Sequence, residues 1–173
     1  MQPPAREGLA NAVRSAIHLE LRDSYMLDDP GFAAFQQGHR LHLADRGSWW
    51  NGWHDAVAAA VARGVTVRRA RVVSEPLHPY GLYEYDLTPG NLEAGEEVRW
   101  LGRRQAVGLL LPATDFWVFD DNTVLFHHFT GEGQLAADGR EYRTDPAMAK
   151  TLGAVFGAVW ERATPHTEYT PAT

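Results

Sequence analysis

The fold is most clearly indicated by the stretch Phe116-Trp117-Val118-Phe119-Asp120-Asp121-Asn122-Thr123-Val124-Leu125-Phe126. Two runs of aromatic and β-branched residues, which favour strands, flank three short polar residues that suit a tight turn. The stretch therefore predicts a β-hairpin. Apolar side chains stand at consecutive positions on both arms, so both faces are expected to be covered, and we place the hairpin centrally in a sheet.

Upstream of the hairpin, helix and strand patterns follow each other directly. Apolar residues recur at helical spacing over 53–61, with Asn51 as N-cap and Gly64 as the stop signal. The valine-rich run 65–74 then predicts a strand, and period-two alternation predicts another over 17–21. A helix that leads straight into a strand is typical of a βαβ unit.

Four shorter elements complete the prediction between these segments. We expect a short helix around 32–37, a strand over 80–87, a turn at 88–90 and a short strand over 97–101.

The last element predicted is a helix near the end of the chain. Asp145 and Pro146 suit its N-cap and first turn, and an apolar stripe runs from Met148 to Val159. The fold class that follows is α/β: a single domain over 1–173 with a mixed central sheet and helices on its faces. Its core is expected at about 13–163, followed by a C-terminal tail at 164–173.

Composition excludes several classes of function. The 173 residues are 45% hydrophobic and 22% charged, which is typical of one globular domain. The net charge of −6 disfavours direct binding of nucleic acid, and the absence of cysteine removes disulfides and thiolate chemistry. No stretch has the pattern of a signal peptide or a membrane span, so we expect a cytoplasmic protein. We also expect neither a metal ion nor a cofactor.

Three blocks of sequence together resemble a known family. They are Arg71-Val72-Val73-Ser74-Glu75-Pro76, the stretch 94–101 (AGEEVRWL), and Leu111-Pro112 with 115–121 (DFWVFDD). The chain is similar, over about 16–169, to an uncharacterised actinobacterial family of domains of unknown function. Members are often encoded beside helix-turn-helix regulators, so the resemblance implies a regulatory partner role.

A looser similarity is to one half of the phospholipase D fold, in which helix, strand and terminal hairpin come in this order. That enzyme family uses His-x-Lys followed after four residues by Asp. If Asp120 is the aspartate, Ala113 and Asp115 hold the other two positions, and if Asp121 is, Thr114 and Phe116 hold them. Neither register supplies a nucleophile or a cation, so we expect no phosphodiesterase activity.

The candidates for acid or base chemistry are His127, His128 and Asp120. Adjacent residues of a strand face opposite sides, so His127 and His128 cannot enter one site or chelate one metal ion. Asp120 suits the hairpin turn better than a catalytic role.

The candidate surface for a ligand or partner combines charged and aromatic residues of the family-like blocks and their neighbours. Its members are Arg71, Glu75, Tyr83, Tyr85, Glu96, Arg99, Trp100 and Trp117. For the arginines at 68, 69 and 71 we favour a simpler interpretation: a solvated strand edge, or pairs with Glu75, Glu84 or Glu97.

Our leading functional hypothesis is a non-catalytic sensor or interaction domain, the partner of a DNA-binding transcription regulator, with a small-molecule ligand as a further candidate. The first alternative is an enzyme of actinobacterial specialised metabolism that acts on a small molecule, with His127 or His128 as acid or base. The second alternative is a structural subunit.

Overall fold

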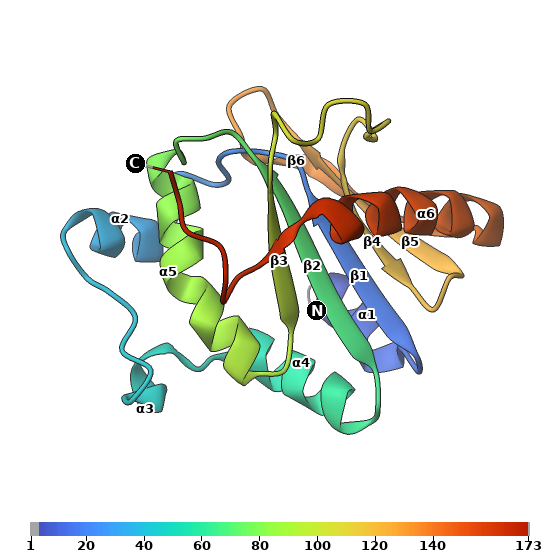
Figure 1. The fold of residues 1–173 in the computed structure, drawn as a ribbon. Coiled ribbons are helices and arrows are strands. Elements are labelled where there is room, and N and C mark those ends of the chain that lie inside the picture. The colour runs from blue at the N-terminus through green and yellow to red at the C-terminus, as the bar shows by residue number, and fades with distance from the viewer. Residues whose placement is uncertain (1–3, 173) are drawn as a thin grey trace.

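The computed structural model describes residues 4–172 and contains one seven-stranded mixed sheet of order β6-β5-β4-β1-β2-β3-β7 (Figure 1). The strands are β1 (Ser15–Glu20), β2 (Thr66–Val73), β3 (Glu97–Gly102), β4 (Asp115–Phe119), β5 (Thr123–Phe129), β6 (Leu135–Thr144) and β7 (Thr164–Pro165). Strands β1, β2 and β3 are parallel, and the remaining pairs are antiparallel. The predicted α/β class with a mixed sheet is confirmed.

Helices cover both faces of the sheet. They are α1 (Pro4–Asn11), α2 (Pro30–Gln36), α3 (Arg46–Trp49), α4 (Gly52–Ala62), α5 (Pro79–Glu93) and α6 (Pro146–Arg162). Figure 1 shows α6 across one face and α1 and α4 behind the other, with α5 beside β3. Within residues 4–172, no helix combines the length and the apolar character needed to cross a membrane.

Strand alternation divides the apolar residues into two main cores. On the α6 face, Leu19, Val72 and Phe116 pack with Leu152 and Phe156 of the helix, among others. On the opposite face, a second core joins residues of four strands to α1 and α4; its members include Leu9, Val57, Val67, Trp117, Phe119 and Leu125. Both arms of the β4–β5 hairpin are therefore covered on both sides, as predicted.

The hairpin turn and the helix caps also follow the sequence pattern. Asp120 and Asp121 adopt φ values of 54° and 56°, the left-handed conformation that a two-residue hairpin turn requires. Asn51 caps α4 by accepting a hydrogen bond from the Trp53 backbone N–H, and Asp145 caps α6 through the Met148 N–H.

The prediction of a strand over 80–87 and a turn at 88–90 is wrong, because both segments lie inside α5. Pro79 occupies the first turn, where its missing N–H costs nothing, and the His78 ring accepts the Tyr80 N–H as a cap. Tyr80, Tyr83 and Leu87 stand at helical spacing and pack with Phe32 of α2. The aromatic residues that suggested a strand instead form the buried side of a helix.

Two strands escaped prediction. β6 is an edge strand rich in charged residues, a composition that protects edges from unwanted pairing and hides the strand pattern. β7 has two residues and pairs with β3 in the segment expected as a tail. His166 and Tyr169, which follow it, are buried.

Candidate ligand-binding site

Polar side chains converge at the carboxyl ends of the parallel strands, on the face that α5 covers. Register pairs His18 of β1 with Arg69 of β2, and Asp115 of β4 with His127 of β5. Because alternate residues share a face, Glu20 lies beside His18 and Arg71 beside Arg69. This edge of an α/β sheet is where ligands commonly bind.

A buried ion network forms the floor of this region. Glu20 accepts hydrogen bonds from Arg69 at 2.7 Å and from Arg71 at 2.5 Å. Arg69 also donates to Glu96 at 2.7 Å, and Arg71 lies 3.5 Å from Glu84 of α5. Since the two arginines are at most 9% exposed, their pairing is what makes burial of the charges tolerable.

Three carboxyl groups respond differently to this burial. Desolvation opposes the ionisation of Glu20, but the positive charges of Arg71 and Arg69 outweigh it and lower the pKa of this carboxyl. Burial raises the pKa of Glu84 to about 8, against the field of Arg71. Burial also raises the pKa of Asp115 to about 7, although the carboxyl accepts hydrogen bonds from the Tyr25 hydroxyl and the Leu21 N–H.

His18 is the most unusual member of the cluster. It is 6% exposed, and within the described part of the chain neither ring nitrogen has a hydrogen-bond partner. Its Nδ1 lies 3.4 Å from Glu20 Oε1 without hydrogen-bond geometry, and its ring stacks on Trp117. Burial lowers the pKa of His18 well below its usual value, so the ring is neutral at pH 7.

These side chains line a cavity of about 260 Å³, which we call the α5 cavity. Its polar members are His18, Glu20, Arg69, Glu84, Asp115, His127 and Arg140, and the others are Tyr25, Met26, Tyr80, Phe129 and Leu135. The His127 ring meets His18 edge-on at 6.0 Å, and burial lowers the pKa of His127 to about 4. Both imidazoles therefore present a neutral ring to the cavity, with one donor and one acceptor each.

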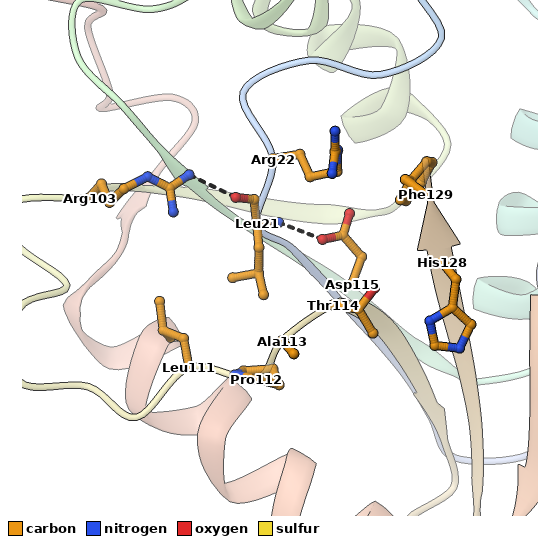
Figure 2. Close-up of a pocket in the computed structure, with 10 residues that line it drawn as sticks. All are labelled: Leu21, Arg22, Arg103, Leu111, Pro112, Ala113, Thr114, Asp115, His128 and Phe129. Atoms are coloured by element: carbon orange, nitrogen blue, oxygen red, sulfur yellow. Dashed lines mark hydrogen bonds between the residues drawn. The ribbon is translucent and has the colours of Figure 1, made fainter. Parts of the chain in front are cut away.

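A second cavity, of about 560 Å³, adjoins the first at Asp115 and Phe129 and is shown in Figure 2. Arg22, Arg103 and His128 contribute to its wall. Figure 2 shows Arg103 turned to the Leu21 carbonyl, to which it donates at 2.7 Å, and Asp115 turned to the Leu21 N–H at 2.9 Å. His128 bonds to Glu141 at 2.8 Å and is exposed, so the two adjacent histidines serve different cavities.

The four charged residues predicted as one recognition surface are not all brought together. Arg71 and Glu96 belong to the buried network, whereas Glu75 accepts a hydrogen bond from the Tyr169 hydroxyl at 2.7 Å. Arg99 lies on the α6 face, 4.4 Å above the Trp160 ring, and donates to the Trp160 carbonyl. Strand alternation separates Arg99 from Arg71 because their positions differ in parity along paired strands.

The aromatic members of that surface are also dispersed. Tyr83 packs against Phe32, and Trp117 stacks on His18. Tyr85 and Trp100 form a separate cluster with Tyr169, in which the Trp100 Nε1–H donates to His166. Two of these aromatic rings therefore meet lining residues of the α5 cavity: Trp117 stacks on His18, and Tyr83 meets Tyr80 edge-on at 5.5 Å.

The interpretation of the arginine run as a solvated edge is wrong for Arg69 and Arg71, whereas the alternative of a pair with Glu84 is confirmed for Arg71 at 3.5 Å. β2 lies between β1 and β3, so Arg69 and Arg71 are buried. Arg68, on the other face, pairs with Glu97 at 3.2 Å as expected. Asp120 acts in the turn: its carboxylate accepts the backbone N–H groups of residues 13, 14 and 15 at 2.7–2.9 Å.

Sequence reasoning did not single out His18, Glu20, Glu84 or Asp115 for ligand binding. In the 17–21 alternation, His18 and Glu20 stand at the polar positions, which ordinarily face solvent. The available signal was the coincidence of polar positions on four strands, β1, β2, β4 and β5, that share one sheet edge. Among residues 4–172, no group of three or more His, Cys, Asp or Glu side chains is arranged to hold a metal ion.

Comparisons with known proteins identify relatives of this architecture. The model of the family described as "Domain of unknown function (DUF6879)" matches residues 5–171. No curated protein matches the sequence. Among solved structures, the phospholipase D family member Nuc from Salmonella typhimurium has a TM-score of 0.54 at 13% identity, covering 94% of this chain and 88% of that one.

Two further structures are similar at lower scores. The archaeal chromatin protein TrmBL2, whose structure shows a novel mode of DNA binding, has a TM-score of 0.49 at 18% identity, covering 92% of this chain and 48% of that one. NucT from Helicobacter pylori has a TM-score of 0.48 at 11% identity, covering 94% and 88%. The likeness to Nuc concerns the fold alone, and it confirms the predicted similarity to the phospholipase D fold.

Proposed function

The chain belongs to the family of domains of unknown function DUF6879, and we propose that it is a non-catalytic sensor domain that binds a small molecule in the α5 cavity. The observation that carries the proposal is His18, whose ring lines the cavity with both nitrogens unpartnered by any described residue. A buried polar group without a partner costs about 1–3 kcal/mol. A ligand with one donor and one acceptor would relieve that cost.

The non-catalytic part of the proposal rests on the residues at the carboxyl edge. In the register that uses Asp120, the nucleophile position of the phospholipase D motif holds Ala113 and the lysine position holds Asp115. Asp115 is a carboxyl that is 2% exposed and accepts a hydrogen bond from Tyr25. The lysine position therefore has no cation to hold a phosphoryl group. We therefore expect no hydrolysis of phosphodiesters by the pure protein.

The partner of this sensor is proposed to be a helix-turn-helix regulator in the cytoplasm. Support comes from the family-like blocks and from the net charge of −6, which disfavours direct contact with DNA and leaves that task to another chain. Co-purification of the two proteins, with and without ligand, tests this part of the proposal.

The alternative is an acid–base enzyme, and one observation favours it. A single cavity holds two carboxyls with raised pKa values, about 8 for Glu84 and about 7 for Asp115, and the neutral His127, whose pKa is lowered to about 4. Neighbouring ionisable groups whose pKa values are shifted in opposite directions are common in active sites. Ion networks also produce such shifts, and no activated nucleophile adjoins these groups among the described residues.

One experiment separates the two candidates. The purified chain is screened against polar molecules of up to about ten non-hydrogen atoms by thermal shift, and each compound that binds is incubated and analysed by mass spectrometry. The sensor proposal predicts compounds that raise the melting temperature and are recovered unchanged. Recovery of a converted compound, with conversion lost in His127→Ala, would establish the enzyme instead.

A further inference from the structure

Resting on the proposed function, we propose that the ligand of the α5 cavity carries a primary ammonium group, which is received by the carboxyl groups of Glu84 and Asp115 and by the neutral imidazoles beside them. The cavity offers a ligand more uncompensated carboxyl groups than free cationic groups.

The cations of the floor are already engaged. Arg69 contacts Glu20 and Glu96, each at 2.7 Å, and Arg71 contacts Glu20 at 2.5 Å and the Thr88 hydroxyl at 2.9 Å. The remaining cationic member of the lining is Arg140, an exposed residue of the edge strand β6. An anionic ligand would therefore have to meet Glu84 and Asp115 without a matching positive charge at the floor.

Two carboxyls of the lining, Glu84 and Asp115, have no cation of their own as a close partner among the described residues. Glu84 has Arg71 at 3.5 Å, but the same guanidinium is closer to Glu20. Among residues 4–172, the hydrogen bonds to Asp115 come from two neutral donors, the Leu21 N–H and the Tyr25 hydroxyl, and the charge of Arg22, which makes no ion pair with it, lowers its pKa less than burial raises it. The raised pKa values of about 8 for Glu84 and about 7 for Asp115 have the same cause, because burial is not offset by enough positive charge.

The other walls suit an ammonium group as well. Tyr25, Tyr80 and Phe129 line the cavity, with the Tyr25 ring 6.1 Å from Tyr80 and 5.2 Å from Phe129. Aromatic faces attract cations, most strongly where water is excluded. A primary ammonium has three N–H donors, and the imidazole acceptor of His18 or His127 can take one beside the two carboxyls.

The volume of the cavity also indicates the size of the group that it can receive. Its volume of about 260 Å³ corresponds to about nine water molecules at roughly 30 Å³ each. Because the cavity opens to solvent, this volume describes the part of the ligand that enters it: an amine-bearing portion of about ten non-hydrogen atoms, with apolar atoms against Phe129 and Leu135.

Binding of an ammonium should release protons. The charged and titratable groups that face Glu84 and Asp115 are His18, Glu20, Arg22, Tyr25, Arg69, Arg71, Tyr80, His127 and Arg140. The histidines among them are neutral at pH 7, so the two carboxyls dominate between pH 6 and 8. A cation favours their ionised forms, so affinity should rise with pH by up to about tenfold per unit for each proton released. An anion would show the opposite trend.

The test uses three probes of similar size and different charge: n-butylammonium, n-butanol and n-butyrate. Binding is followed through the ring ¹⁵N resonances of His18 and His127 in the full chain at pH 6, 7 and 8. We expect n-butylammonium to bind with a millimolar Kd that falls at least fivefold from pH 6 to 8, and more tightly than either other probe. Glu84→Gln and Asp115→Asn should each weaken it at least tenfold at pH 8, whereas His128→Ala should not.

The outcomes separate this inference from the proposed function. Tighter binding of n-butyrate or n-butanol, or affinity for n-butylammonium that falls with rising pH, would overturn the ammonium inference while leaving the cavity a ligand site. If no probe moves the His18 and His127 resonances at any pH, the proposed function is overturned as well. If one carboxyl variant does not fold, the other variant and the pH trend of the unmodified chain still decide.

Discussion

The imidazole ring of His18 stacks on the indole of Trp117, with centroids 4.2 Å apart and planes 14° apart. Trp117 is a cross-strand partner of His18, and its own ring stacks further on Phe119 at 5.6 Å. The stack therefore connects the ligand cavity at the carboxyl edge of the sheet to the apolar core beneath α1 and α4. Packing of the core determines where the His18 ring can lie.

Truncation of this stack should destabilise the protein. Trp117 is 1% exposed and Phe119 is 4% exposed, so Trp117→Ala or Phe119→Ala should each cost about 3–5 kcal/mol of unfolding free energy. Denaturant melts measure the loss, and Leu110→Ala, at a side chain 91% exposed, serves as the control. Unchanged melting in both aromatic variants would mean that the hairpin contributes little to the core.

The two arginines on opposite faces of β2 should differ sharply. Arg71→Ala leaves Glu20 and Glu84 with less compensation in a buried site and should cost about 3–5 kcal/mol. Arg68→Ala removes a pair with Glu97 in which both side chains are at least 41% exposed, and should cost about 0–1 kcal/mol. Equal losses of unfolding free energy in the two variants would contradict the buried network.

Stability should depend on pH through Glu84. Burial raises its pKa to about 8, so between the usual glutamate value and pH 8 the unfolded chain binds fewer protons than the folded one. The contribution of this group to stability therefore falls as pH rises, by up to about 1.4 kcal/mol per unit, and levels off above pH 8. In Glu84→Gln this contribution should be absent, leaving the decline that Asp115, with its pKa raised to about 7, gives in the same direction. Denaturant melts of both proteins at pH 5, 6.5 and 8 test the point, and a constant difference between them would refute it.

The hairpin turn offers a matched pair of variants. Asp120 accepts three backbone N–H groups at the start of β1 and in the two residues before it, so Asp120→Ala should cost about 1–3 kcal/mol. Asp121 has a similar φ but only an exposed contact with Arg14 at 3.7 Å, and Asp121→Gly should be neutral or stabilising because glycine adopts this φ freely. Thermal melts that rank the two variants in the reverse order would count against this role of Asp120.

The elements with one dominant local pattern were predictable from sequence. The α4 helix with its Asn51 cap, the valine-rich β2 and the 116–126 hairpin agree with the structure because periodicity, capping and turn chemistry favour the same result there. The tyrosines of α5 suggested a strand, but in the structure they pack against α2 from one side of a helix. β6 carries too few apolar residues to be recognised before its pairing partner is known.

The site was less predictable, because its residues are distant in sequence and ordinary in type. Glu20 and Arg69 are 49 positions apart, and each belongs to a strand whose alternation assigns a polar residue to solvent. Their burial follows from α5, in which 80–87 was predicted as a strand and 88–90 as a turn. Once that helix covers the carboxyl edge, the polar positions of β1, β2, β4 and β5 become the lining of a cavity.

The most direct test of the ligand site compares two adjacent histidines. His127 lines the α5 cavity, whereas His128 lines the neighbouring cavity and bonds to Glu141. The measurement is the thermal shift produced in His127→Ala and in His128→Ala by the compound that most stabilises the unmodified chain. We predict that the shift is lost in His127→Ala and kept in His128→Ala. A shift kept in His127→Ala and lost in His128→Ala, or no stabilising compound at all, would contradict the assignment of the site to the α5 cavity.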